Sequence, residues 1–139
     1  RIARSFRGAA FADYDNDGDV DVLLTALDEP PLLLRNDLPD PANRLQIALV
    51  GTRSNRDGVG ARVAVTSGGA TSIRERKGGG SYLSASDPRI HVGLGSATQA
   101  DRVEVRWPSG TIDVLTNVPA NDSLVIREGS SPPAGPQEN

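Results

Sequence analysis

The residues with the clearest capacity for chemistry form one short stretch, DYDNDGDVD, at positions 13–21. Five carboxylates this close together repel one another, and burying any one of them alone would be costly. A bound divalent cation turns that repulsion into attraction, and an all-oxygen ligand set favours Ca²⁺ over Zn²⁺ or Cu²⁺. The predicted ligands are Asp13, Asp15, Asp17, the backbone carbonyl of Asp19, and Asp21.

The spacing of these aspartates follows the ligand order of a calcium loop, and Gly18 stands where a tight turn is needed. Two features depart from an EF-hand. Leu24 occupies the place of the bidentate glutamate, and the flanking segments RGAAFA and VDVLLTA have the pattern of strands. The sequence therefore predicts a strand–calcium loop–strand unit with a weak Kd, about 10⁻⁴ to 10⁻³ M. Mg²⁺ binding, or a solvated acidic turn without a metal, is the alternative.

Length and composition limit what surrounds this loop. The chain has 139 residues, 37% apolar and 4% aromatic, which allows one domain or one domain with a smaller attachment. A net charge of −3 argues against a nucleic-acid surface. The absence of cysteine excludes disulfides, thiolate metal sites and a cysteine nucleophile, and no apolar run approaches the ~20 residues of a membrane helix. Because the first residue is Arg1, we expect a processed protein or a fragment of a longer one.

Apolar and polar residues alternate along much of the chain, which is the period of a strand with one buried face. The predicted buried positions are Leu45, Ile47 and Leu49; Val63 and Val65; Val103, Val105 and Trp107; and Ile112 and Val114. The turn sequences WPSGT and SGGA predict two hairpins, 102–107 with 111–116 and 62–66 with 72–76. We therefore predict an all-β fold, an antiparallel sandwich or barrel-like domain preceded by the calcium-loop unit.

Proline-rich segments predict the domain boundaries. DEPP at 28–31 is expected to interrupt the N-terminal part, and DLPDPAN at 37–43 has the composition of a connector. We expect a calcium-loop repeat over 1–38 and a β domain over 39–129. A disordered tail is expected over 130–139, because SSPPAGPQEN lacks apolar anchors.

The single histidine does not indicate catalysis. His91 has no second histidine with which to hold a metal. A Ser-His-Asp arrangement with Ser81 or Ser84 and Asp87 has no nucleophile-elbow motif to support it. We therefore expect no enzymatic activity, with a hydrolase as the alternative.

Two further groups of residues have a structural and a functional interpretation. Trp107 is expected in the core, and the alternative is a sugar-stacking platform shared with Tyr82. Arg74, Arg76 and Lys77 are expected to form a solvated strand end, and the alternative is a site for an acidic glycan or carboxylate partner.

Residues 7–37 resemble an FG-GAP/VCBS repeat, the calcium-binding unit of integrin-like β-propellers. The remainder resembles the ASPIC/UnbV domain, which follows such repeats. The matching pieces are NRLQIALVGTRSNRDGVGARVAV, GGGSYLS, HVGLG, VEVRWPSG and NDSLVIREG. Together with residues 7–37 they cover most of residues 7–129.

This resemblance implies a secreted or cell-surface calcium-binding protein of adhesion type, and it implies no established catalytic activity. The implied partners are proteins or glycans at the cell surface or in the matrix, and a homodimer by strand pairing is compatible with it. A carbohydrate-binding module of a secreted protein is the alternative function, and a structural cap for a propeller is another.

Overall fold

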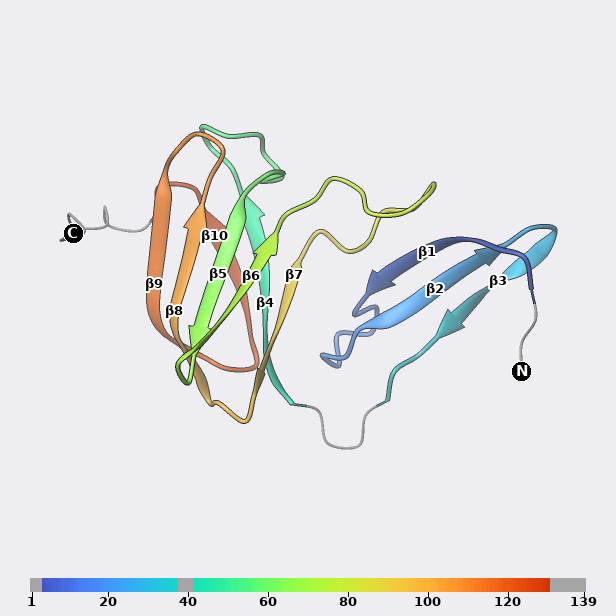
Figure 1. The fold of residues 1–139 in the computed structure, drawn as a ribbon, viewed down its shortest axis with the longest axis horizontal. Coiled ribbons are helices and arrows are strands. Elements are labelled where there is room, and N and C mark those ends of the chain that lie inside the picture. Colours follow the sequence, from blue (N-terminus) through green and yellow to red (C-terminus); the bar gives the residue numbers. More distant parts are fainter. Residues whose placement is uncertain (1–3, 38–41, 131–139) are drawn as a thin grey trace. The chain divides into compact units, whose positions relative to one another are not determined.

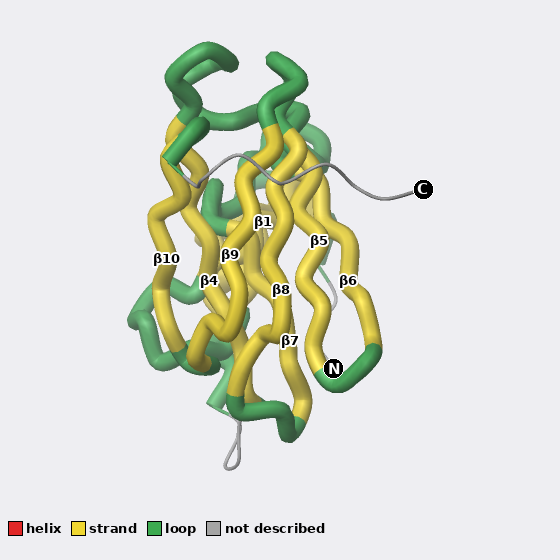
Figure 2. The backbone as a smooth tube through the Cα atoms, turned by 90° about the vertical axis from the view of Figure 1, so that its left-hand side faces the viewer, coloured by secondary structure: helices red, strands yellow, loops and turns green. Residues whose placement is uncertain are grey.

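The computed structural model describes residues 4–37 and 42–130, and within these ranges the chain forms ten β-strands and no helix (Figures 1 and 2). The predicted all-β fold is therefore confirmed. It follows that this part of the chain has no helix that is long and apolar enough to cross a membrane. The predicted tail, from residue 131 onward, and most of the predicted connector lie outside the described residues.

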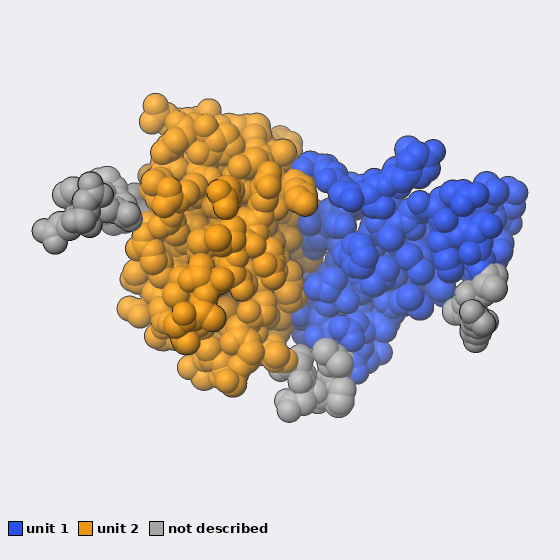
Figure 3. All heavy atoms as spheres, viewed as in Figure 1, with its two compact units in different colours: residues 1–41, 78–87 blue, residues 42–77, 88–139 orange. Residues whose placement is uncertain are grey.

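The chain divides into two compact units (Figure 3). Residues 1–41 and 78–87 form the N-terminal unit, and residues 42–77 and 88–139 form the sandwich unit. The sandwich unit has a three-stranded sheet in the order β10–β4–β7 and a four-stranded sheet in the order β6–β5–β8–β9 (Figure 1). Its strands are β4 Asn43–Val50, β5 Arg62–Ser67, β6 Ala70–Glu75, β7 Ile90–Gly95, β8 Gln99–Arg106, β9 Ile112–Pro119 and β10 Asp122–Arg127.

All neighbouring strands of the sandwich unit run antiparallel except β10 and β4, which run parallel with Asp122 opposite Leu45. Both predicted hairpins are present, as β5–β6 and β8–β9. The second closes with hydrogen bonds from Trp107 N to Thr111 O and from Gly110 N to Trp107 O, both 2.9 Å. Gly110 has a φ of 89°, which a residue with a side chain rarely adopts.

The core of the sandwich unit consists of the inward residues of both sheets. Its buried apolar side chains are Leu45, Ile47, Leu49, Ala61, Val63, Val65, Ile90, Val92, Ala100, Val103, Val105, Trp107, Val118 and Ile126. Each fully buried side chain of Val or Leu size contributes about 1.5–3 kcal/mol. The alternation seen in β4, β5 and β8 thus predicted the core correctly, Trp107 included.

The alternation predicted the wrong face of β9. Ile112 and Val114 are only half-buried, and Asp113 between them is fully buried. The aspartate is stable there because its Oδ2 accepts hydrogen bonds from Trp107 Nε1 (2.7 Å) and from Gly129 N (2.8 Å). A buried carboxylate that is hydrogen-bonded in this way avoids the cost of losing water.

The N-terminal unit contains an antiparallel sheet of β1 Phe6–Ala12, β2 Asp21–Ala26 and β3 Glu29–Leu34. DEPP was predicted to interrupt this region, but its two prolines lie inside a strand, so this part of the prediction is wrong. The turn occurs at Asp28, with a φ of 55°, and Pro30 and Pro31 already lie in β3. Proline is tolerated there because β3 is an edge strand, where a missing N–H costs least.

The segment 84–87 runs beside β1 within the N-terminal unit. Asp87 N donates to Phe11 O (2.9 Å), and Phe11 N donates to Ser86 Oγ (3.2 Å). Gly8 permits this approach, because a Cβ at that position would lie 2.6 Å from Ser84 Oγ. The predicted β domain over 39–129 includes these residues, and its boundaries stay a prediction.

One buried carboxylate fixes a distant loop of the sandwich unit. Glu128, directly after β10, accepts hydrogen bonds at Oε2 from the backbone amides of Thr52, Arg53 and Ser54, at 2.8, 2.8 and 2.7 Å. Its Oε1 accepts from the hydroxyls of Ser54 and Ser109. Burial by itself would raise the pKa of Glu128, but the hydrogen bonds from Ser109 and the three amides outweigh it and lower the pKa to about 2.

This lowered pKa predicts a pH dependence of stability. Because the pKa is depressed from 4.5 in the folded protein, Glu128 stabilises the fold above pH 4.5, and that stabilisation is lost as the pH falls toward 2. We expect this residue to contribute at most about 3 kcal/mol to the loss. Urea denaturation from pH 6 to 2, compared between wild type and Glu128→Gln, measures it. Parallel curves for the two proteins would contradict the prediction.

Candidate metal centre

The aspartate loop connects β1 to β2, and the pairing of these strands determines where it begins and ends. Ala12 lies opposite Asp21 in the antiparallel register, so the first and last residues of the loop are held close together. Two turns shape the segment between them. Asn16 has a φ of 60° and Gly18 a φ of 104°, and the second value is strained for any residue with a Cβ.

Three of the predicted ligands come together. Carboxylate oxygens of Asp13, Asp15 and Asp21 all lie within 4.8 Å of one another. Asp13 is 4% exposed and Asp21 is 1% exposed, so two of these like charges are withdrawn from water. Such an arrangement is electrostatically costly unless a positive charge lies among the oxygens. A set of carboxylate oxygens suits a hard cation of the Ca²⁺ type, and the residues present therefore fit the predicted ion.

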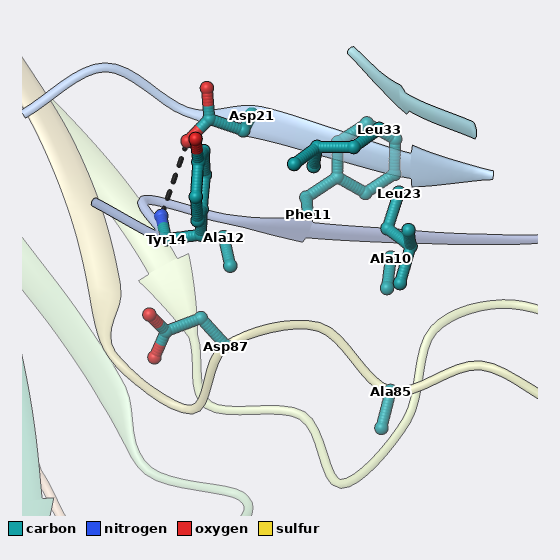
Figure 4. Close-up of a pocket in the computed structure, with 9 residues that line it drawn as sticks. All are labelled: Ala10, Phe11, Ala12, Tyr14, Asp21, Leu23, Leu33, Ala85 and Asp87. Atoms are coloured by element: carbon teal, nitrogen blue, oxygen red, sulfur yellow. Dashed lines mark hydrogen bonds between the residues drawn. The ribbon is translucent and has the colours of Figure 1, made fainter. Parts of the chain in front are cut away.

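Backbone amides hold the two buried carboxylates in place. Gly18 N donates to Asp13 Oδ2 (3.0 Å), and Tyr14 N donates to Asp21 Oδ2 (3.2 Å), the second of which is drawn in Figure 4. Asn36 N, just after β3, donates to Asp21 Oδ1 (2.8 Å). Amide donors stabilise the ionised form of a carboxylate. The loop is thus organised by its own backbone and by the residues that follow β3.

The other two predicted ligands lie outside this group of three. Asp17 Oδ1 accepts a hydrogen bond from Asp19 N (2.9 Å), which makes a small turn inside the loop. Asp19 was predicted to contribute its backbone carbonyl and not its side chain. Both residues remain predicted ligands.

Sequence reasoning missed Arg35, which lies directly after β3. Its Nε is 3.2 Å from Asp15 Oδ2 and 2.5 Å from Asp37 Oδ1, and its Nη2 is 3.8 Å from Asp17 Oδ2. The charge of Asp15, followed by that of Asp37, raises the pKa of Arg35. The sequence RND after an apolar run could have indicated this arginine, because closely spaced aspartates are stabilised by a nearby positive charge.

An apolar pocket of about 320 Å³ adjoins the loop within the N-terminal unit (Figure 4). Apolar side chains form most of its wall, and Tyr14 and Asp21 connect it to the loop. The lining residues are Ala10, Phe11, Ala12, Tyr14, Asp21, Leu23, Leu33, Ala85 and Asp87. The side chains of Phe11, Leu23 and Leu33 are each between 42% and 47% exposed, so this sheet carries accessible apolar surface.

The aromatic and histidine candidates lie in different parts of the chain. Trp107 is 4% exposed in the core, so it does not form the sugar-stacking platform considered as an alternative, and Tyr82 is 68% exposed. His91 lies on β7 in the sandwich unit, whereas Ser81, Ser84 and Asp87 belong to the N-terminal unit.

Comparison with known proteins identifies related sequences. Residues 51–133 match the family described as ASPIC and UnbV. The chain is 31% identical over 125 residues to cartilage acidic protein 1 of Homo sapiens, covering 87% of this chain and 18% of that protein. It is 32% identical over 107 residues to the Mus musculus protein of the same name, covering 74% and 16%. The chain thus spans less than a fifth of the length of these relatives.

Proposed function

The chain belongs to the ASPIC and UnbV family, and from that premise we propose that it is a non-enzymatic, calcium-binding interaction module of a longer extracellular protein. The observation that carries the proposal is the convergence of the Asp13, Asp15 and Asp21 carboxylates, two of them buried. Similarity to cartilage acidic protein 1 supports a role outside the cell.

In this proposal Ca²⁺ is held by Asp13, Asp15 and Asp21, with Asp17 and the carbonyl of Asp19 completing the ligand set. Of the residues after β3, Asn36 orients Asp21, whereas Arg35 pairs with Asp15 and its positive charge opposes the ion. The bound ion supplies positive charge that links the two ends of the loop. Because the loop has no bidentate glutamate, we propose millimolar to submillimolar affinity.

We further propose that residues 1–38 form an FG-GAP/VCBS-type repeat and residues 39–129 the ASPIC/UnbV-like domain. The order strand, acidic loop, strand supports the first assignment. All buried apolar residues among those described belong to the sandwich unit, whereas the N-terminal sheet exposes Phe11, Leu23 and Leu33. A repeat of this kind buries its faces against neighbouring repeats. The partners we propose are proteins or glycans of the cell surface or matrix, with homodimerisation by strand pairing at an open sheet edge.

Calcium titration tests this proposal. We expect the wild-type protein to release or absorb heat with CaCl₂ and to gain about 1 kcal/mol of stability at a free Ca²⁺ concentration several times the Kd. Asp15→Asn, which removes one converging charge at a partly exposed position, should weaken the affinity about tenfold.

The matched control is Asp57→Asn, whose side chain is 64% exposed in the sandwich unit and which should leave the affinity unchanged. No heat and no thermal shift for wild type in millimolar CaCl₂ would end the calcium proposal. Equal weakening by both variants would show that only net charge matters.

A further inference from the structure

Positive charge is concentrated on part of the sandwich unit, although the chain as a whole carries −3. Residues 62–77 and 99–106, which include β5, β6 and β8, carry six cationic and three anionic side chains. These strands lie side by side in the four-stranded sheet (Figure 2). Val63, Val65, Val103 and Val105 point into the core, so the residues that alternate with them form the outer face.

The outer face places two arginines directly opposite each other. Arg62 on β5 is in register with Arg106 on β8 and with Glu75 on β6. Arg106 Nε bonds Glu104 (2.7 Å), and Arg102 Nη2 bonds the other oxygen of the same carboxylate (2.6 Å). Within residues 4–37 and 42–130, the guanidinium of Arg62 forms no ion pair. Arg62 thus faces a like charge on β8, which destabilises a sheet, and an opposite charge on β6, which stabilises it.

A shallow pocket of about 150 Å³ lies beside this pair of arginines. Its lining residues are Arg62, Ala64, Ile73, Glu104 and Arg106. Ala64 has the smallest side chain among them. A guanidinium presents a planar fork of N–H donors that matches the oxygens of a sulfate or carboxylate group. The two guanidinium groups outnumber the single carboxylate of Glu104 in this lining, so the pocket carries net positive charge and has room for one small anionic group.

We propose that this outer face binds a linear sulfated polysaccharide, with one sulfate group bound between Arg62 and Arg106. This inference deepens the proposed interaction function and rests on it, because it names the class of partner. Arg102 adds positive charge along the same face, and Arg76 and Lys77 follow just beyond the edge strand. Arg74 is opposite the core residue Val63 in the register, so it lies on the other face of β6. A repeating polyanion can contact several of these groups at once, which gives affinity without a deep cleft.

The composition of the face favours a polysaccharide over other polyanions. Single-stranded nucleic acids bind by stacking on aromatic rings. Of the five aromatic residues, Phe6, Phe11, Tyr14 and Tyr82 belong to the N-terminal unit and Trp107 is buried. A protein partner would need a cluster of apolar anchors, and the strongly exposed apolar residue on these four strands is Ile73, at 53%.

Binding to heparin, measured by surface plasmon resonance at several salt concentrations, tests this inference. We expect wild type to bind heparin and not neutral dextran. Arg62→Gln should weaken binding about fivefold and reduce the slope of log Kd against log salt by about one. The thermal midpoint of Arg62→Gln should change little, because the substitution removes both the like charge opposite Arg106 and the opposite charge facing Glu75 and breaks no ion pair.

The matched control is Arg127→Gln, which removes the same charge from an exposed position on β10. Equal weakening by the two variants, or binding to poly-glutamate as tight as to heparin, would overturn the inference. The calcium titration is run on the same proteins. Calcium binding without heparin binding refutes only the polysaccharide inference, and heparin binding through Arg62 without calcium binding refutes only the metal part of the proposed function.

Discussion

Replacing Glu128 with glutamine is expected to lower the free energy of unfolding by about 3 kcal/mol. Three backbone amides and two hydroxyl groups donate to this carboxylate. Glutamine can keep its one oxygen toward the three amides, but its NH₂ group then faces the two hydroxyls, and the negative charge that strengthens all five hydrogen bonds is lost. A loss of this size is a large fraction of the stability of a domain of this length.

Equilibrium denaturation in urea, followed by the fluorescence of the buried Trp107, measures this loss. The matched control is Glu75→Gln, at an exposed position on β6, which should change the stability by less than about 0.5 kcal/mol. A loss below about 1 kcal/mol for Glu128→Gln would show that the loop retains its structure without the carboxylate.

The second large effect is expected at Gly58, where alanine should cost about 3 kcal/mol. Gly58 has a φ of 63°, and an added Cβ would lie 2.8 Å from Leu49 Cβ and 3.2 Å from Trp107 Cζ3. The backbone strain accounts for about 1 kcal/mol, and the collision with two core side chains accounts for the remainder.

Gly68 separates these two contributions. It has a similar φ of 55°, but no atom lies within 4 Å of an added Cβ. Gly68→Ala should therefore cost only the strain, about 1 kcal/mol, in the same urea assay. Equal losses for the two variants would mean that the core accommodates the methyl group at Gly58.

The sequence predicts elements of the fold wherever local information suffices. Alternation identified β4, β5 and β8, and turn chemistry identified both hairpins. The parallel pairing of β4 with β10 could not be predicted, because period two fixes a buried face but not the neighbouring strand. The buried face of β9 was missed for a related reason. An aspartate is expected on the exposed face, and Asp113 is buried only because Trp107 and Gly129 donate hydrogen bonds to it.

The candidate site was likewise predictable only where its residues are close together in the sequence. The loop's aspartates are neighbours in sequence, so their spacing alone indicated shared ligation. Arg35 and Asn36 act from beyond β3, and they reach the loop only because three strands fold back on one another. Glu128 binds amides 74–76 residues away, a distance over which no sequence pattern operates.

The parallel pairing of β4 and β10 has a consequence for biosynthesis. Every residue of β4 in this ladder finds its partner 77 positions later, as Leu45 does in Asp122. At about 5–20 residues per second, a ribosome needs several seconds to supply that partner. Throughout this interval one edge of β4 has open backbone groups, and an unpaired edge of this kind is open to pairing with another chain.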